Sequence, residues 1–312
     1  LKQILNVYPP ALNHYKKRIN WEDIDQNATR SLLSICLIED LGKKRGDNIL
    51  DSDQTTKICQ ISTNGKASIV SRETLILCGL GIVPRILEIF DGSQIKYNFS
   101  KKDGELVHRG ETIGVLEGKV DKILMVERTI LNFLQKMSGV ATSTSEFCKI
   151  IEPYGVGLLD TRKTTPGMRL LEKYATGCGG GFNHRMGLHD QIMVKDNHLA
   201  AASAKDDYDL KDFLTRISSR NKKNSILQVE VDNLNQLAIA IEAGVDAVLL
   251  DNFSPSEIET AVKFCENRVV LESSGGINLT NIVDYAKARP HFISTGSPIH
   301  SSRWVDIALD WS

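Results

Sequence analysis

Six short apolar runs recur along the second half of the chain, and each ends in polar residues. Segments with helical spacing, such as NLNQLAIAIEAG and PSEIETAVKFCEN, separate most of these runs. A repeated strand and helix predicts a parallel sheet with right-handed crossovers. Because no dinucleotide-binding glycine fingerprint accompanies the repeat, we expect an incomplete (β/α) TIM-like barrel. The six runs are GVGLLDTRK, QIMVKDNH, ILQVEVDN, AVLLDNF, VVLESSGG and HFISTGS.

The preceding part of the chain, roughly the first 120 residues, has a mixed pattern. KASIVSRE and QIKYNF read as strands, GLGIVPRILEIF as a helix, and DGELVHRGETIGVLEG as a glycine-punctuated hairpin. This mixture predicts an α+β open sandwich domain around a small antiparallel sheet. A long helix follows, roughly over residues 121–151. We therefore expect an N-terminal domain at 1–127 and the barrel at 128–302, with a C-terminal tail, 303–312, that packs on the first domain.

Composition excludes several classes of protein. The 312 residues are 41% hydrophobic and 25% charged, which is typical of a globular chain. A net charge of −1 gives no general attraction for nucleic acid or an anionic membrane. The most apolar window is broken by Pro84 and Arg85, so we expect no membrane-spanning segment. The six cysteines include no CxxC pair, which indicates reduced thiols and a cytoplasmic protein.

Charged residues stand where the apolar runs end. In a (β/α) barrel the carboxyl ends of the strands meet at one mouth. Any strand must end in something polar, but so many charges at one mouth would be costly unless a ligand or metal used them. The charged residues at these ends are Asp160, Arg162, Lys163, Lys195, Glu230 and Asp251.

The types of charge indicate a polyanionic ligand. Arginine favours bidentate contacts with carboxylate or phosphate, and lysine acts as a point charge. The cations expected at the mouth are Arg162, Lys163, Arg185 and Lys195. Glu230 and Asp251, on consecutive strands, suit Mg²⁺, which needs few protein ligands, although they could instead pair with the lysines.

Two glycine-bearing turns end the last two predicted strands, SSGG at 273–276 and TGS at 295–297. Glycine lets backbone N–H groups approach an anion, and the last strand ends of such barrels often hold a phosphate. The mouth therefore suits a sugar phosphate with a pyrophosphate group, together with a carboxylated second ligand.

The successive motifs resemble those of the quinolinate phosphoribosyltransferase family from about Glu39 to the C-terminus. DTRKTTPG, GGGFNHR and KDNH at these spacings are the most specific. Two stretches depart from the family pattern: EDLGKKRGDNI carries extra residues, and GSPIHS replaces a more usual alanine-leucine-threonine version. The resemblance implies a Mg²⁺-dependent enzyme of NAD biosynthesis. It would convert quinolinate and phosphoribosyl pyrophosphate to nicotinate mononucleotide, pyrophosphate and CO2.

The resemblance also implies how quinolinate is held. His184 would lie beside the quinolinate carboxylates, and Lys163 would contact the pyrophosphate. In this family a neighbouring subunit completes the active site with its counterpart of Arg128, which implies at least a homodimer with shared sites. The cations implied for the quinolinate carboxylates are Arg128, Arg162, Arg185 and Lys195.

For phosphoribosyl pyrophosphate, the resemblance implies that Glu230 and Asp251 hold the ribose hydroxyls and Mg²⁺. The residues implied for the 5′-phosphate are Ser274, Gly275 and Gly296, with His300 nearby. The residues implied for catalysis are Lys163, Lys195, Glu230 and Asp251.

Two other functions fit parts of the sequence. A related phosphoribosyltransferase with a different acceptor could use the same scaffold, but an acceptor without two carboxylates would not need four cations. A biotinyl or lipoyl carrier could use the predicted hairpin, but a carrier needs a modified lysine at its turn, and DGELVHRGETIGVLEG contains none.

Overall fold

The computed structural model describes the chain in five stretches, residues 9–42, 53–90, 94–203, 209–221 and 225–312. Most of EDLGKKRGDNI, the stretch that departs from the family pattern, lies outside these residues. In the described part of the chain, no helix combines the length and apolarity needed to cross a membrane.

The chain forms two compact units, each assembled from separate stretches. The predicted boundary between residues 127 and 128 falls inside one continuous helix, α5 (Val120–Ile151). The barrel unit comprises Leu1–Arg18, Glu146–Thr164 and Gly181–His300. The sandwich unit comprises Ile19–Ser145, Thr165–Gly180 and Ser301–Ser312.

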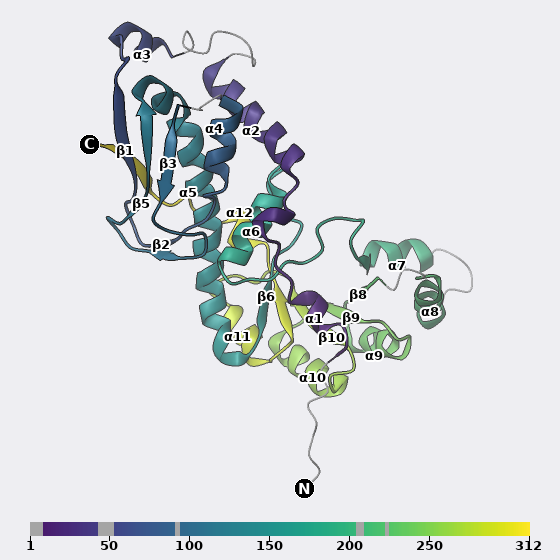
Figure 1. The fold of residues 1–312 in the computed structure, drawn as a ribbon. Helices are drawn as coiled ribbons and strands as arrows, with labels where there is room; N and C mark the ends of the chain where they lie inside the picture. The colour runs from purple at the N-terminus through teal and green to yellow at the C-terminus, as the bar shows by residue number, and fades with distance from the viewer. Residues whose placement is uncertain (1–8, 43–52, 91–93, 204–208, 222–224) are drawn as a thin grey trace. The chain divides into compact units, whose positions relative to one another are not determined.

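The barrel unit is built on a parallel sheet of six strands in the order β6-β11-β10-β9-β8-β7. Each of the six predicted apolar runs forms one of these strands, so the α/β prediction is confirmed (Figure 1). A single bridge between Leu159 and Phe182 adds one more segment beside the edge strand β6. The strands are β6 (Gly157–Leu159), β7 (Ile192–Val194), β8 (Leu227–Val231), β9 (Ala247–Asp251), β10 (Val270–Ser274) and β11 (Phe292–Ser294).

Helices connect these strands and bury one face against the sheet. The start of α10 is fixed by a capping box: the Ser254 side chain accepts from the Glu257 amide, and the Glu257 side chain accepts from the Ser254 amide. Leu237 and Ile258 are fully buried in the shared core. The helices of this unit that follow β7 are α7 (Asp196–Ser203), α8 (Leu210–Arg220), α9 (Leu234–Glu242), α10 (Pro255–Cys265), α11 (Ile282–Lys287) and α12 (Ser297–His300).

The first described residues pack with the barrel unit, whereas the sequence placed them in the N-terminal domain. Short helix α1 (Leu12–Tyr15) buries Tyr15 against Leu159 and Phe292. The Asn183 amide donates to the Lys17 carbonyl at 2.9 Å. This placement could not be predicted from the sequence, because α1 is short and its partners lie far along the chain.

The sandwich unit contains an antiparallel sheet in the order β12-β1-β5-β3. The C-terminal strand pairs with β1, with Leu309 opposite Ile69, as the yellow strand beside β1 in Figure 1 shows. Helices α2 (Gln26–Leu41), α3 (Gln54–Cys59), α4 (Ile82–Phe90) and α6 (Arg169–Cys178) also belong to this unit. The strands are β1 (Asn64–Ser71), β3 (Lys96–Phe99), β5 (Thr112–Lys119) and β12 (Ile307–Trp311).

The predicted hairpin at DGELVHRGETIGVLEG is wrong. A turn closes it, with the Glu111 amide donating to the His108 carbonyl at 3.1 Å. However, β4 (Leu106–Val107) pairs with β2 (Leu75–Ile76), while β5 joins the larger sheet. The glycine pattern identified the turn correctly, but it could not show that the two strands separate. The segment therefore lacks the paired hairpin that suggested a carrier domain.

Candidate active site

A pocket of about 340 Å³ opens at the carboxyl ends of the barrel strands. Most of the residues proposed from the sequence line it, because Asp160 and Lys195 directly follow β6 and β7, and Asp251 ends β9. The lining residues are Thr161, Arg162, Lys163, His184, Arg185, Met193, Lys195, Glu230, Leu249, Asp251, Glu272, Ser274 and Ser294. The structure thus gathers cations, carboxylates and a few apolar side chains at one mouth.

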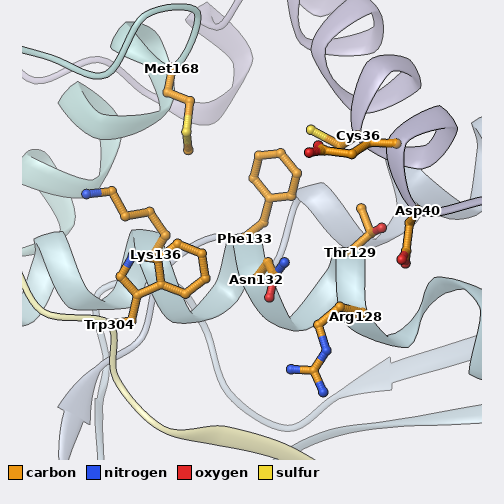
Figure 2. Close-up of a pocket in the computed structure, with 10 residues that line it drawn as sticks. Cys36, Asp40, Arg128, Thr129, Asn132, Phe133, Lys136, Met168 and Trp304 are labelled. Atoms are coloured by element: carbon orange, nitrogen blue, oxygen red, sulfur yellow. The ribbon is translucent and has the colours of Figure 1, made fainter.

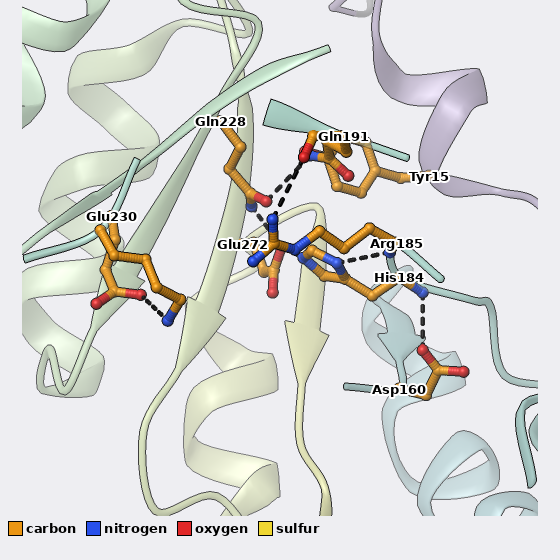
Figure 3. A network of polar contacts seen from close by, with 9 residues as sticks. Tyr15, Asp160, His184, Arg185, Gln191, Gln228, Glu230 and Glu272 are labelled. Carbon is orange, nitrogen blue, oxygen red and sulfur yellow. Dashed lines mark hydrogen bonds and ion pairs between the residues drawn. The ribbon is translucent and has the colours of Figure 1, made fainter. Parts of the chain in front are cut away.

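Glu230 is paired with a lysine across neighbouring strands. Lys195 Nζ donates to Glu230 Oε2 at 2.8 Å (Figure 3). The Lys195 amide also donates to His198 Nδ1 at 3.0 Å, which orders the start of α7. The expectation that the acids could serve as lysine partners therefore holds for Glu230. A polyanion that drew Lys195 away would leave the Glu230 carboxylate available for another cation.

Asp251 is the second acid of the mouth. Asn252 Nδ2 donates to Asp251 Oδ2 at 2.7 Å. Burial raises the pKa of Asp251 above its usual value. Asp232 and Asp196 act in the same direction, while Lys195 and Lys163 oppose them. An acid that is costly to ionise in the free protein gains from a bound cation.

The residues of the mouth could hold magnesium through two protein carboxylates, those of Glu230 and Asp251. Among the described residues, no cluster of three or more His, Cys, Asp or Glu side chains could hold a metal. Magnesium commonly takes one or two protein carboxylates and completes its shell with water and substrate phosphates. Glu230 and Asp251, both lining the mouth, match that requirement.

Gly275 packs against the residue that follows β9. It has φ +106°, and an added Cβ would lie 2.2 Å from Asn252 Oδ1 and 2.8 Å from the Asn252 backbone nitrogen. Only glycine fits a backbone that close in that conformation. Ser274, directly before it, lines the mouth, so the structure places the first turn of the predicted phosphate cradle at the pocket.

Gly296 brings the second turn to the same place. An added Cβ there would lie 2.9 Å from His300 Cδ2 and 3.2 Å from Lys163 Cβ. The Ser297 amide donates to Thr295 Oγ1 at 3.1 Å, which fixes the turn. Gly296, His300 and Lys163 are thus neighbours.

Asp160 serves the fold rather than the mouth. Its side chain is 3% exposed and accepts hydrogen bonds from Asn183 Nδ2 and the His184 amide, both at 2.8 Å. It therefore holds the segment that carries the pocket residues His184 and Arg185. The charge that ends β6 turns inward, and the two cations that follow it line the pocket.

A buried polar network lies behind the mouth, and Figure 3 shows its members converging from separate elements. His184 Nε2 lies 3.3 Å from Glu272 Oε2, and Gln228 Nε2 donates to the same oxygen at 2.6 Å. Burial alone would raise the pKa of Glu272, but His184 and hydrogen bonds from its neighbours lower that pKa below the usual value. Glu272 is therefore a buried carboxylate that stays ionised.

Arg128 lies in the sandwich unit and lines a different pocket. That pocket, of about 390 Å³, lies between α2 and α5 side chains (Figure 2). Arg128 is exposed there, and Glu39 and Asp40 line the same pocket. Within the chain, Arg128 is thus not among the residues that line the barrel mouth.

Two family models match the chain along most of its length. The N-terminal domain model of quinolinate phosphoribosyl transferase matches residues 53–138, and the C-terminal domain model matches residues 140–310. The chain belongs to the quinolinate phosphoribosyltransferase family. The family predicted from the motifs is therefore confirmed, and with it the class of enzyme, a pentosyltransferase.

Relatives of this phosphoribosyltransferase agree with that assignment. A probable carboxylating nicotinate-nucleotide pyrophosphorylase from Bacillus subtilis is 35% identical and covers 90% of this chain and 92% of its own length. The carboxylating nicotinate-nucleotide pyrophosphorylase from Mycobacterium leprae is 34% identical, over 92% of this chain and 99% of its own length. The solved structure of the nicotinate-nucleotide pyrophosphorylase from Francisella tularensis has a TM-score of 0.86 and 36% identity. The match covers 95% of this chain and 99% of that chain.

Sequence reasoning about this phosphoribosyltransferase missed the network behind the mouth. It assigned no role to Glu272, Gln191, Gln228 or Tyr15. The available signal was a charged residue inside the apolar run VVLESSGG, since a buried strand admits a carboxylate only when partners satisfy it.

Proposed function

We propose that the chain is a carboxylating quinolinate phosphoribosyltransferase, which forms nicotinate mononucleotide, pyrophosphate and CO2 from quinolinate and phosphoribosyl pyrophosphate. The observation that carries this proposal is the single mouth that gathers Arg162, Arg185 and Lys195 with the acids Glu230 and Asp251. A dicarboxylate needs the first set, and a ribose with a leaving pyrophosphate needs the second.

The reaction requires no protein nucleophile, because the quinolinate ring nitrogen attacks the ribose carbon. The cations hold the two carboxylates and orient that nitrogen, so the encounter becomes effectively intramolecular. Lys163, beside Gly296 in the mouth, stabilises the charge that develops on the departing pyrophosphate. Ser274, Gly275 and Gly296, with His300 beside them, bind the 5′-phosphate.

Loss of CO2 follows ribosylation of the ring nitrogen. The bond between the ring and the adjacent carboxylate then breaks, and the cationic ring stabilises the electron pair left on the ring carbon. That carbon takes up a proton as CO2 departs. Arg162, Arg185 and Lys195 position that carboxylate. They must not hold it more tightly in the ground state than in the transition state, because such binding would slow its departure.

Magnesium is the proposed cofactor, with Glu230 and Asp251 as its protein ligands. When bound, it would supply positive charge that stabilises the leaving pyrophosphate. The raised pKa of Asp251 supports this assignment, because a carboxylate that is costly to ionise gains when a cation arrives with the substrate. Glu230 would exchange its lysine partner, Lys195, for the metal.

We further infer that the enzyme acts as at least a homodimer with shared active sites. The support is Arg128, a family cation that is exposed on the sandwich unit and is not among the residues that line the barrel mouth. A second subunit would deliver its own Arg128 to the mouth. A cytoplasmic location also stays a prediction, based on the spacing of the cysteines.

The direct test supplies the purified protein with quinolinate, phosphoribosyl pyrophosphate and magnesium and follows nicotinate mononucleotide and CO2 together. Both products in equal amounts, with release dependent on magnesium, are the expected result. A folded protein that releases neither product would reject the acceptor assignment. Other carboxylated heterocycles would then be tested with the same ribosyl donor.

A further inference from the structure

A closed ring of hydrogen bonds lies behind the mouth of the barrel. The Arg185 amide donates to His184 Nδ1 at 2.7 Å, and His184 Nε2 lies 3.3 Å from Glu272 Oε2. Gln228 Nε2 donates to that oxygen at 2.6 Å, and Gln191 Nε2 donates to Gln228 Oε1 at 3.1 Å. Arg185 Nη1 donates to the Gln191 carbonyl at 3.3 Å, which closes the ring.

The directions of these bonds follow from Glu272. An ionised carboxylate only accepts hydrogen bonds, so the amide nitrogen of Gln228 must face it. Gln228 Oε1 then accepts from Gln191, whose amide nitrogen also donates to Tyr15 Oη at 2.7 Å. His184 accepts at Nδ1, so its hydrogen lies on Nε2 and points to Glu272. Glu272 therefore sets the orientation of two amides, and the Arg185 amide sets the His184 tautomer that donates to Glu272.

Every member of the ring is buried. Gln228 and Glu272 are fully inaccessible, and the other three members are at most 8% exposed. Buried polar groups that lose a partner inside a protein cannot recover it from water. Removing Glu272 would therefore release the hydrogen-bond donors of His184 and Gln228 together.

Arg185 connects the hydrogen-bonded ring to the pocket, because its side chain lines the mouth. Burial lowers the pKa of the Arg185 guanidinium, and the nearby charge of Arg162 acts in the same direction. Two cations that repel each other need fixed anchors to share one anionic ligand. The Gln191 carbonyl and the His184 ring provide such anchors for the Arg185 side chain and backbone.

We propose that Glu272 is a positioning residue of the quinolinate site: it holds His184, and through the ring it holds Arg185, in the orientation that receives a substrate carboxylate. The inference rests on the proposed function, because it takes quinolinate as the ligand of Arg185. Both imidazole nitrogens of His184 have partners within the protein, so His184 connects Arg185 to Glu272.

The kinetic test compares Glu272→Ala and Glu272→Gln with the wild type. Glu272→Ala should raise the KM for quinolinate by about tenfold or more and leave the KM for phosphoribosyl pyrophosphate within about twofold. Glu272→Gln keeps one acceptor oxygen for His184 and Gln228, so it should recover much of the loss. Asp246→Asn is the matched control. Asp246 accepts from the Leu227 amide at the opposite end of the sheet, and its replacement should change neither constant.

A double-mutant cycle tests whether Glu272 acts through Arg185. In an Arg185→Ala background, Glu272→Ala should add little further loss of quinolinate affinity, because the group that it positions is gone. Full additivity would overturn the proposal. So would an equal rise in both Michaelis constants together with a fall in thermal stability, because that pattern marks a merely structural acid.

A measurement on the free protein separates this inference from the proposed function. Nitrogen-15 NMR should find His184, identified by its loss in His184→Gln, with its proton on Nε2. Glu272→Ala should shift the Nε2 resonance, because the partner of that nitrogen is lost. A His184 proton on Nδ1 would overturn the ring whatever the substrate is. If the tautomer is as expected but calorimetry finds no quinolinate binding to the wild type, the proposed function fails and the ring stands as a structural feature.

Discussion

Lys195 and Glu230 meet across β7 and β8 at 2.8 Å, so a cation proposed for quinolinate and an acid proposed for magnesium are partners in the free enzyme. Under these proposed roles, the pair must separate when either substrate is fully bound. The two binding events are therefore expected to be coupled, because whichever ligand arrives first frees the partner for the other.

Glu230→Ala should weaken the use of phosphoribosyl pyrophosphate. Loss of one of two metal carboxylates is expected to raise its KM by about tenfold or more and to increase the magnesium concentration needed for half-maximal rate. Steady-state kinetics at several magnesium concentrations measure both. Glu242→Ala, which removes an exposed acid paired with Lys211, is the control. A magnesium dependence like that of the wild type would contradict the metal assignment.

Arg162→Ala should chiefly destroy quinolinate binding. Charge-assisted hydrogen bonds contribute about 1.5–3 kcal/mol, so the affinity should fall by roughly 10-fold to 100-fold. Isothermal calorimetry with quinolinate measures this loss. Arg216→Ala, on the exposed side of α8, should leave the affinity unchanged. A wild-type KM for quinolinate in the Arg162→Ala protein would show that Arg162 does not bind a quinolinate carboxylate.

Asp251→Asn should stabilise the free protein while it abolishes efficient turnover. Because the pKa of Asp251 is raised in the folded state, its ionisation opposes folding at neutral pH, and that cost disappears as the pH falls below the ordinary aspartate range. The variant should therefore melt at a higher temperature than the wild type at pH 7 and at the same temperature near pH 3. A lower melting temperature at pH 7 would show that the carboxylate is favourably paired.

His291 should make stability depend on pH. Burial lowers its pKa to about 4, and its Nδ1 accepts from the Leu271 amide at 3.0 Å. The unfolded chain takes up this proton near pH 6.5, so stability is complete above that value and falls as the pH approaches 4. The fall amounts to at most about 3 kcal/mol. Urea unfolding from pH 7 to pH 4 should show a smaller fall for His291→Asn, whereas the exposed His108→Asn should behave like the wild type.

Subunits with complementary defects should restore activity when mixed. If the partner supplies Arg128 to a barrel mouth, Arg128→Ala and Lys163→Ala proteins are each nearly inactive. A mixed dimer nevertheless holds one mouth with both residues intact. Unfolding and refolding the two together, then assaying product, tests this directly. A mixture as inactive as its components would place Arg128 in the site of its own chain. An Arg128→Ala protein that is active alone would place Arg128 outside any site.

The sequence could predict what depends on neighbours along the chain. The strand ends near Asp160, Lys195 and Asp251 can be predicted because an apolar run stops at each of them. The parallel sheet can be predicted because such runs recur along the chain. The Glu272 ring could not be predicted, because its five members come from four separate segments and only the folded sheet brings them together. The place of α1 was missed for the same reason: Tyr15 finds its partners more than a hundred residues away.

The pairing of β12 with β1 has a consequence for how the chain is made. Ile69 and Leu309 are 240 positions apart, and the whole barrel sheet is encoded between them. At synthesis rates of about 5–20 residues per second, that edge of β1 waits roughly 12–50 seconds for its partner. During that time it is an open strand edge that can pair with other chains. The sandwich unit is therefore expected to be prone to misassociation until the C-terminal strand has been made.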